Sequence, residues 1–140
     1  MSVEAFDTNV FIYYFDETDA RKKAIARSLV QTALSTSDVA ISYQVVQETL
    51  NALTTKFRLP ANEGDLEGFF RGVLVPLWTI MPSPALYERG LQTRRRYQLH
   101  FYDALVVAGA LHAGCRRLLS EDLQHGQVIE GLTIVNPFLE

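Results

Sequence analysis

The chain has 140 residues, and its 13 basic and 16 acidic side chains give a formal net charge of −3 at neutral pH. With 48% hydrophobic and 21% charged residues, the composition is that of a folded globular protein and excludes a disordered one. Because 140 residues is an ordinary length for one domain, we expect a single domain over residues 1–140. The slightly negative charge excludes a nucleic-acid binder that acts through bulk positive charge.

Neither a membrane span nor a secretory signal is expected. The longest stretch without a charged residue covers 16 residues, from Gly72 to Tyr87, and it contains three prolines, whereas a membrane helix needs about 18 or more apolar residues. Acidic residues occupy the N-terminal segment, where a signal peptide would carry basic ones. We therefore expect a cytoplasmic protein with no membrane partner. Cys115, the one cysteine, is expected to be a buried and unreactive thiol.

The secondary-structure pattern alternates short apolar runs with longer segments of helical spacing. The apolar runs predict five strands, at residues 3–6, 39–41, 77–81, 117–119 and 132–135. The longer segments predict five helices, at residues 19–34, 43–57, 63–74, 85–97 and 102–112. Because the strands and helices alternate, we expect an α/β fold with a mainly parallel sheet.

Several helix ends carry recognisable capping residues. Thr18, Asn62 and Ser83 precede predicted helices and are residue types that cap helix N-termini, and Pro84 after Ser83 strengthens the third signal. Gly114 follows the last predicted helix and is expected to adopt the left-handed conformation that ends helices.

Two of the predicted helices differ in how they are expected to pack. In the helix at 43–57, one apolar stripe runs through Val46, Leu50, Leu53 and Phe57, so this helix should pack on one side. Residues 104–111 are apolar all round, which predicts the most buried helix of the domain. Asp103, just before this run, is then a charge at the edge of a core.

Acidic residues at the strand ends are the first candidates for chemistry. In a parallel α/β sheet, ligands bind beyond the carboxyl ends of the strands. Asp7 follows the first predicted strand and Asp122 follows the fourth, so both carboxylates are expected to converge there. Asp103 at a helix start fits a plain capping role equally well. Glu48 lies opposite the apolar stripe of its helix, so periodicity alone predicts a solvent-exposed surface residue.

These acids stand in sequence strings that resemble a known family. The chain is similar to PIN-domain ribonucleases, above all to the toxins of bacterial VapBC toxin–antitoxin pairs, over essentially its whole length. The strings that carry the resemblance are Phe6-Asp7-Thr8-Asn9-Val10, Ser42-Tyr43-Gln44-Val45-Val46-Gln47-Glu48, Tyr102-Asp103-Ala104-Leu105-Val106-Val107-Ala108 and Leu119-Ser120-Glu121-Asp122. No single string is specific, but the four acids in this order, each in the expected element, make the match specific.

The resemblance implies a fold, a site and an activity. The implied fold is a three-layer α/β/α PIN-like domain with a central, mainly parallel five-stranded sheet. The implied site consists of Asp7, Glu48, Asp103 and Asp122 as catalytic residues and metal ligands, which moves Glu48 from the surface into the cleft. The implied activity is metal-dependent cleavage of RNA that leaves 5′-phosphate and 3′-hydroxyl ends. An antitoxin partner and a homodimer are also implied.

The sequence departs from the family in the last string. Many relatives carry a further acid where this chain has Gln124, so Glu121 is an alternative to Asp122 as the fourth acid, and we favour Asp122. Polar neighbours of the acids, expected to orient them or to serve only in turns, are Thr8, Asn9 and Ser120.

The chemistry of such a site accounts for its residue types. Mg²⁺, or Mn²⁺, is a hard cation that prefers carboxylate and water oxygens, and either can activate water and offset phosphate charge. Clustered carboxylates without a cation would raise one another's pKa values. The basic run Arg94, Arg95 and Arg96 is the candidate for contacting RNA phosphates, although a solvated helix face is an ordinary role for such residues.

Other functions fit the sequence less well. Haloacid-dehalogenase-like phosphatases also place an Asp after the first strand, but they need a second acid two residues later, where this chain has Asn9. Response-regulator receivers need an acidic pair and a late Lys that are not evident. A PIN-fold module that only binds RNA or protein, and a housekeeping PIN nuclease, remain as alternatives.

Overall fold

One six-stranded sheet organises the chain, and the computed structural model describes residues 2–55 and 62–140. The strands are β1 (Glu4–Phe6), β2 (Val39–Ser42), β3 (Trp78–Ile80), β4 (Arg117–Leu119), β5 (Val128–Ile129) and β6 (Leu132–Val135). Their order across the sheet is β3-β2-β1-β4-β6-β5, and every neighbouring pair is parallel except β5 and β6. The prediction of five strands missed β5, whose two residues are too few to show a pattern.

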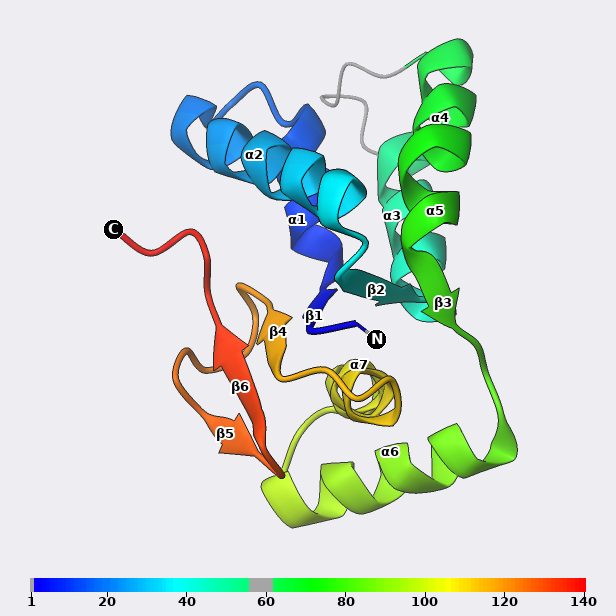
Figure 1. Ribbon diagram of the computed structural model, residues 1–140, viewed down its shortest axis with the longest axis vertical. Helices are drawn as coiled ribbons and strands as arrows, with labels where there is room; N and C mark the ends of the chain where they lie inside the picture. The colour runs from blue at the N-terminus through cyan, green and yellow to red at the C-terminus, as the bar shows by residue number, and fades with distance from the viewer. Residues whose placement is uncertain (1, 56–61) are drawn as a thin grey trace.

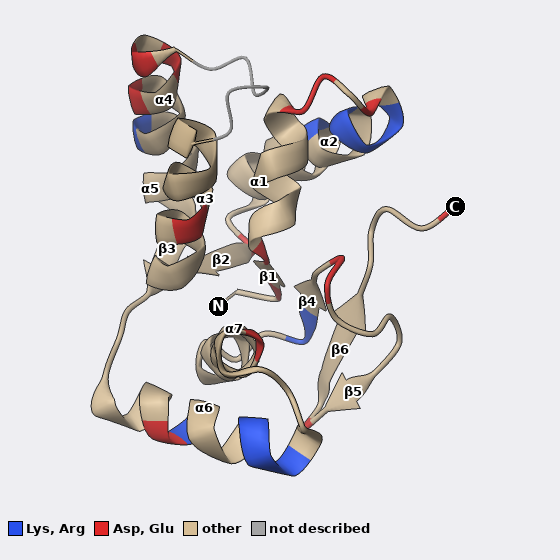
Figure 2. Ribbon diagram, turned by 180° about the vertical axis from the view of Figure 1, so that it is seen from behind, with Lys and Arg blue, Asp and Glu red and all other residues tan. Residues whose placement is uncertain are grey.

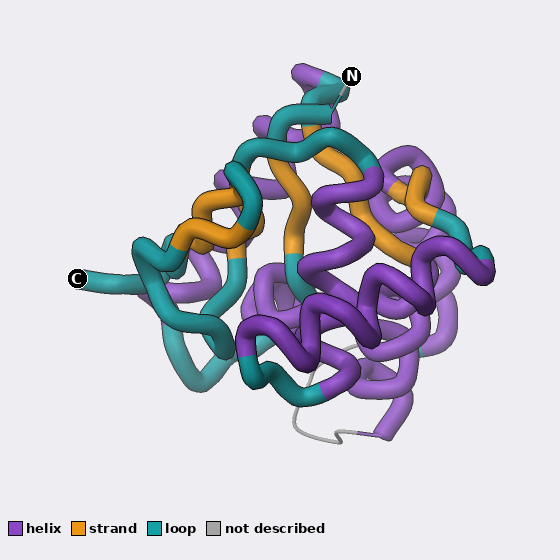
Figure 3. The backbone as a smooth tube through the Cα atoms, turned by 90° about the horizontal axis from the view of Figure 1, so that it is seen from below, coloured by secondary structure: helices purple, strands orange, loops and turns teal. Residues whose placement is uncertain are grey.

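Helices cover both faces of the sheet, which gives the three expected layers (Figure 1). One side carries α1 (Thr8–Phe15), α2 (Ala20–Thr36), α3 (Tyr43–Thr55), α4 (Glu63–Phe69), the π-helical η1 (Phe70–Leu74) and α5 (Val75–Leu77). The other side carries α6 (Pro84–Tyr97) and α7 (Phe101–His112). The C-terminal segment extends away from the layered body, as Figure 3 shows. The fold class expected from the sequence is confirmed.

Helix α1 was not among the predicted elements. It has only eight residues, several of them aromatic or β-branched, and these residue types favour strands. Its start is nevertheless encoded, because Asp7 is the N-cap and its side chain accepts a hydrogen bond from the Thr8 N–H. Val10 and Phe11 are fully buried, so tertiary packing compensates for the weak helix propensity of this segment.

Most of the predicted caps are observed. The Asn62 and Ser83 side chains accept hydrogen bonds from the N–H groups of Asp65 and Leu86, respectively, and Gly114 has the expected positive φ of 77°. The Thr18 prediction is wrong, because Asp19 caps α2 while the Thr18 hydroxyl donates to Asp16.

Some predicted element ends need correction, and one falls outside the described residues. The helix expected over 63–74 continues through η1 into α5, where the Val75 N–H bonds to the Phe70 carbonyl five residues back. The strand expected from Leu77 therefore begins one residue later, at Trp78. Phe57, the expected end of the second predicted helix, lies outside the described residues; the described helix runs to Thr55.

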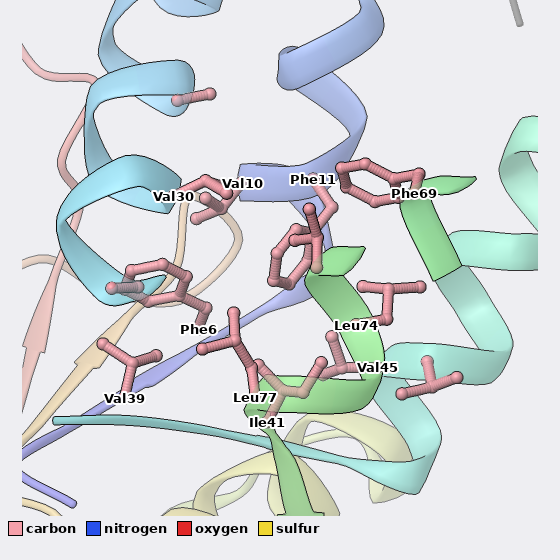
Figure 4. Packing of buried hydrophobic residues seen from close by; sticks show 14 of the residues in the cluster. Phe6, Val10, Phe11, Val30, Val39, Ile41, Val45, Phe69, Leu74 and Leu77 are labelled. Atoms are coloured by element: carbon pink, nitrogen blue, oxygen red, sulfur yellow. The ribbon is translucent and has the colours of Figure 1, made fainter. Parts of the chain in front are cut away.

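Alternation along the strands divides the core into two clusters. Phe6, Val39 and Ile41 point to the α1–α5 side, where Figure 4 shows them packed against residues of those helices. Ala5 and Ala40 point to the other side, against α7. The small side chains on that face let α7 lie close to the sheet, and seven of its residues are buried.

Helix length and the environment of the cysteine are two further features of the fold. Within residues 2–55 and 62–140, no helix combines the length and apolar character needed to cross a membrane. Cys115 is buried, as expected, and burial raises the pKa of its thiol to about 11.

Candidate active site

The site forms where the carboxyl ends of β1 and β4 lie side by side. The two strands pair in parallel, and the Asp7 N–H extends the pairing by donating to the Leu119 carbonyl at 2.9 Å. The chain leaves β1 towards β2 on one side and returns to β4 on the other, so this is the point at which the strand order reverses. Such a reversal leaves a crevice at the carboxyl edge of an open sheet. The first and fourth strands thus bring Asp7 and residues 120–122 together, as the sequence predicted.

Asp7 is the most buried of the four candidate acids, with only 6% of its surface exposed. Its Oδ1 accepts from the Thr8 N–H at 2.7 Å, and its Oδ2 accepts from the Ser120 hydroxyl at 2.8 Å. Burial raises its pKa to about 6; the two hydrogen bonds oppose the shift, and the charges of Asp122 and Glu48 add to it. Asp7 is therefore a carboxylate whose charged form needs a compensating positive charge.

The charge of Asp122 acts on both Asp7 and Asp103. The Asp122 charge raises the pKa of both carboxyls, although burial is the larger cause in each case. Asp103 is not the N-cap of α7, because that position belongs to His100; Asp103 lies in the first turn, half-buried. A plain capping role for Asp103 is thereby excluded. Asp122 itself is exposed at the rim of the crevice.

Glu48 occupies a position that reconciles the two sequence arguments about it. Its side chain is exposed, as helical periodicity predicted. It also lines the pocket beside Asp122, and its charge acts on Asp7, as the resemblance implied. The Gln44 amide, one helical turn earlier and almost fully buried, donates to Glu48 Oε1 at 3.0 Å and to the Tyr102 carbonyl at 3.1 Å. Gln44 thus joins α3 to the start of α7.

Glu121, the alternative fourth acid, is engaged elsewhere. Its Oε1 accepts from the Tyr13 hydroxyl at 2.6 Å, and its Oε2 lies 2.6 Å from the Lys22 ammonium. Both carboxylate oxygens are therefore paired with groups on α1 and α2, whereas Asp122 acts electrostatically on Asp7 and Asp103. This geometry supports Asp122 over Glu121 as the fourth acid.

Three polar residues were expected to orient the acids; Ser120 and Asn9 form hydrogen bonds through their side chains, and Thr8 contacts Asp7 through its backbone N–H. Ser120 is fully buried and donates to Asp7, while its Oγ also accepts from the Asp122 N–H at 3.2 Å. Asn9 Oδ1 accepts from the Glu121 N–H at 3.4 Å. The hydroxyl of Thr8 is buried with no hydrogen-bond partner among the described residues. An unpaired buried hydroxyl beside a carboxylate is a further oxygen donor available to a ligand.

A pocket of about 400 Å³ opens in front of these groups. It is lined by Thr8, Asn9, Ile12, Tyr13, Asp16, Glu48, Asn51, Ala52, Glu121 and Asp122. A larger pocket of about 520 Å³ lies between α1, α2 and α4 and contains none of the four candidate acids. Two of the four candidate acids, Glu48 and Asp122, line the smaller pocket, whereas Asp7 and Asp103 do not line it but experience the charge of Asp122; we therefore regard this pocket as the site.

The donor set has the composition that a hard divalent cation requires. The polar side chains that line the pocket offer carboxylate, amide or hydroxyl groups, without a thiol or an imidazole, and burial disfavours the charged form of the neighbouring Asp7. Within the described part of the chain, no three His, Cys, Asp or Glu side chains lie close enough together to ligate one metal ion. The residues therefore fit such an ion by chemistry and electrostatic coupling, without forming a closed ligand cage.

The arginine run lies apart from this pocket. Arg94, Arg95 and Arg96 form the exposed last turn of α6, and none of them lines the site. Figure 2 shows this basic turn at the edge of the molecule. The guanidinium of Arg96 stacks on the Tyr97 ring, 5.4 Å from its centroid. Any contact of this run with a substrate would therefore be outside the acid site.

Comparison with known proteins agrees with this architecture. The sequence profile of the PIN domain family matches residues 5–130. The chain belongs to the PIN domain family. No curated protein sequence matches it.

Solved structures resemble this PIN domain over nearly its whole length. A toxin–antitoxin complex from Klebsiella pneumoniae has a TM-score of 0.68 and 23% identity, covering 96% of this chain and 97% of that one. VapBC2 from Rickettsia felis, bound to a promoter DNA fragment, has a TM-score of 0.68 and 15% identity over 94% and 96%. VapC20 from Mycobacterium tuberculosis, described as a toxin that cleaves the sarcin-ricin loop, has a TM-score of 0.61 and 18% identity over 85% and 89%. These likenesses establish the shared fold.

Sequence reasoning missed three polar residues of this PIN-domain site. Gln44 carried a local signal, because it stands four residues before Glu48 and such pairs face each other on a helix. Tyr13 and Lys22 carried none, because their partner Glu121 is 108 and 99 residues away.

Proposed function

We propose that this PIN domain is a divalent-metal-dependent endoribonuclease and the toxin of a type II toxin–antitoxin pair. One observation carries the proposal: the buried carboxylate of Asp7, at the carboxyl end of β1, is electrostatically coupled to Asp122 and Glu48 from two other segments. Asp122 in turn acts on Asp103. Bringing like charges together in a partly dehydrated crevice is unfavourable unless a cation offsets it.

In the proposed site, Asp7 and Asp103 are the central ligands, and Glu48 and Asp122 complete the coordination of one or two ions. Mg²⁺, or Mn²⁺, would supply activation of water and charge compensation at phosphorus. Ser120 and the Thr8 N–H hold the Asp7 carboxylate through both of its oxygens. Gln44 does the same for one oxygen of Glu48. These contacts fix the direction in which each carboxylate presents its remaining lone pairs.

RNA is the proposed substrate, and the exposed Arg94–Arg96 turn is its proposed secondary contact. The site is acidic, so a polyanion needs positive charge outside it, and this turn is solvent-exposed. The structurally similar VapC20 is described as a toxin that cleaves the sarcin-ricin loop, which supports RNA as the substrate.

An antitoxin protein is the proposed partner, and the toxin is proposed to act in the cytoplasm as a homodimer. The similar structures from Klebsiella pneumoniae and Rickettsia felis are toxin–antitoxin assemblies, and their likeness supports a partner of this kind.

Cleavage of a structured RNA by the purified chain tests the proposal. We expect cleavage with Mg²⁺ or Mn²⁺, none with excess EDTA, and products with 5′-phosphate and 3′-hydroxyl ends. Asp7→Asn should lower the rate about 1,000-fold, because losing a ligand of this kind forfeits several kcal/mol of transition-state stabilisation. Asp38→Asn, an exposed acid preceding β2 at the opposite edge of the sheet, is the matched control and should cleave normally.

Two results would contradict the proposal. Undiminished metal-dependent cleavage by Asp7→Asn would remove the acid site from the reaction. RNA binding without cleavage under every metal condition would favour the non-catalytic binding module instead.

A further inference from the structure

Glu121 is held by two side chains from different helices. The Tyr13 hydroxyl on α1 donates to Oε1 at 2.6 Å, and the Lys22 ammonium on α2 donates to Oε2 at 2.6 Å. Lys22 also donates to the Tyr13 oxygen at 3.2 Å, which closes a triangle of three polar groups. We call Tyr13, Lys22 and Glu121 the Glu121 clamp.

The clamp is rigid at each of its corners. The Tyr13 ring packs edge-on against Phe138 with centroids 4.8 Å apart. Lys22 lies in the first turn of α2, where its N–H is capped by Asp19. The Lys22 and Glu121 side chains are only 24% and 26% exposed, so water competes weakly for the ion pair. Glu121 is therefore fixed in direction rather than free to rotate.

Fixing Glu121 has a consequence for the residue that follows it. The Glu121 N–H donates to Asn9 Oδ1 and so ties this short loop to the start of α1, while the Asp122 N–H donates to the Ser120 hydroxyl within the loop. With the Glu121 side chain directed towards α1 and α2, the chain presents Asp122 on the side where it acts on Asp7 and Asp103.

We propose that Lys22 and Tyr13 are positioning residues, which hold the Glu121 carboxylate away from the proposed metal ion, at the edge of the pocket, and thereby aim Asp122 towards that ion. This inference rests on the proposed metal-dependent function. The clamp thereby sets the affinity of the site for a divalent cation through geometry, because neither Lys22 nor Glu121 contacts that cation.

Metal affinity distinguishes positioning from simple charge effects. The full chain would be titrated with Mn²⁺ by calorimetry, without RNA, as wild type, Lys22→Met and Glu121→Gln. If the two residues act only through their charges, removing the cation should tighten Mn²⁺ binding and removing the anion should weaken it. If they act by positioning Asp122, both variants should weaken binding, by about 10-fold each.

A double variant and two further substitutions complete the test. Lys22→Met combined with Glu121→Gln should be no weaker than either single variant, because the same contact is already lost. Tyr13→Phe keeps the ring against Phe138, removes only the hydroxyl, and should weaken binding less but in the same direction. Lys23→Met is the matched control, because Lys23 is the next residue on α2 and pairs with Glu17 instead; its affinity should equal that of wild type.

The outcomes separate the two levels of the proposal. Wild-type protein that binds no Mn²⁺ overturns the proposed function, and this inference with it. Wild-type binding with an unchanged or tighter Lys22→Met variant overturns the clamp alone, as does an equal loss in Lys23→Met.

Discussion

The hydroxyl of Ser120 donates a 2.8 Å hydrogen bond to Oδ2 of Asp7, although 113 residues separate the two in sequence. Both residues are buried, and they stand at the carboxyl ends of the adjacent strands β4 and β1. The bond lowers the pKa of Asp7, against the larger effect of burial, which raises it to about 6. Ser120 therefore helps to keep the candidate ligand ionised at neutral pH.

Removing that hydroxyl should affect stability and ionisation together. We expect Ser120→Ala to lower the free energy of unfolding by about 1–2 kcal/mol at pH 7.5, because a buried carboxylate loses a partner. The pKa of Asp7 should rise above that of wild type, so the acid limb of the pH–rate profile should move to higher pH. Chemical denaturation and a pH series of initial rates would measure both; Ser35→Ala, an exposed serine on α2, is the control. An unchanged acid limb would contradict the role of this bond.

The pH dependence of stability should carry the signature of Asp7. Its pKa is about 6 in the folded chain and 3.8 without the environment of the fold, so between these values the folded state binds the extra proton. The free energy of unfolding should therefore fall as pH rises through this window, by about 3 kcal/mol in total. Denaturation of wild type and Asp7→Asn from pH 4 to pH 7 would isolate this contribution. Parallel curves for the two proteins would show that the Asp7 pKa is not raised.

Divalent metal should offset that loss of stability. An ion that binds only the folded chain stabilises it by about 2.7 kcal/mol at 100 times its dissociation constant. Because ligands must be deprotonated, we expect Mg²⁺ to raise the melting temperature more at pH 7.5 than at pH 5. Asp7→Asn should show little Mg²⁺-dependent shift at either pH. An equal shift in wild type and variant would place the ion elsewhere.

Neutralising Asp122 should change the pKa values of two other carboxyl groups. Its charge raises the pKa of Asp7 and of Asp103, so Asp122→Asn should lower both values. Carboxyl ¹³C chemical shifts followed through a pH titration would report them directly. Asp38→Asn is the matched comparison, because Asp38 is exposed and is not among the groups that shift either pKa. Equal effects of the two substitutions would contradict the role of the Asp122 charge.

The arginine turn of α6 should contribute to RNA binding through phosphate charge alone. Changing Arg94, Arg95 and Arg96 to Gln should weaken RNA binding and reduce the slope of log affinity against log salt by about 2, given about 0.7 for each lost phosphate contact with single-stranded RNA. The measurement is best made in the Asp7→Asn background, which prevents cleavage. Arg71→Gln, an exposed residue on η1, is the control. An unchanged slope would exclude the turn from the RNA contact.

How much of the fold was predictable depended on the range of the interactions involved. Ser83 and Asn62 predicted helix starts correctly, because capping is a local hydrogen bond between residues three apart in sequence. The all-apolar run of α7 predicted that this helix is buried, because a helix without a polar face is stable in water only when it is covered by the rest of the protein. Helix α1 escaped prediction because its formation depends on burying Val10 and Phe11 under distant elements.

The sequence by itself determined the acids, their order and the parallel α/β frame, because motifs and periodicity are local properties. Only the tertiary structure decided which acids act on one another, since the pairing of β1 with β4 joins segments more than 100 residues apart. The tertiary structure also pairs Glu121 with Lys22, whereas the Asp122 charge acts on Asp7. The sequence alone does not reveal which of these two adjacent acids has which role. The physical reason is that burial and charge coupling depend on distances in space, which the chain sets only when it is folded.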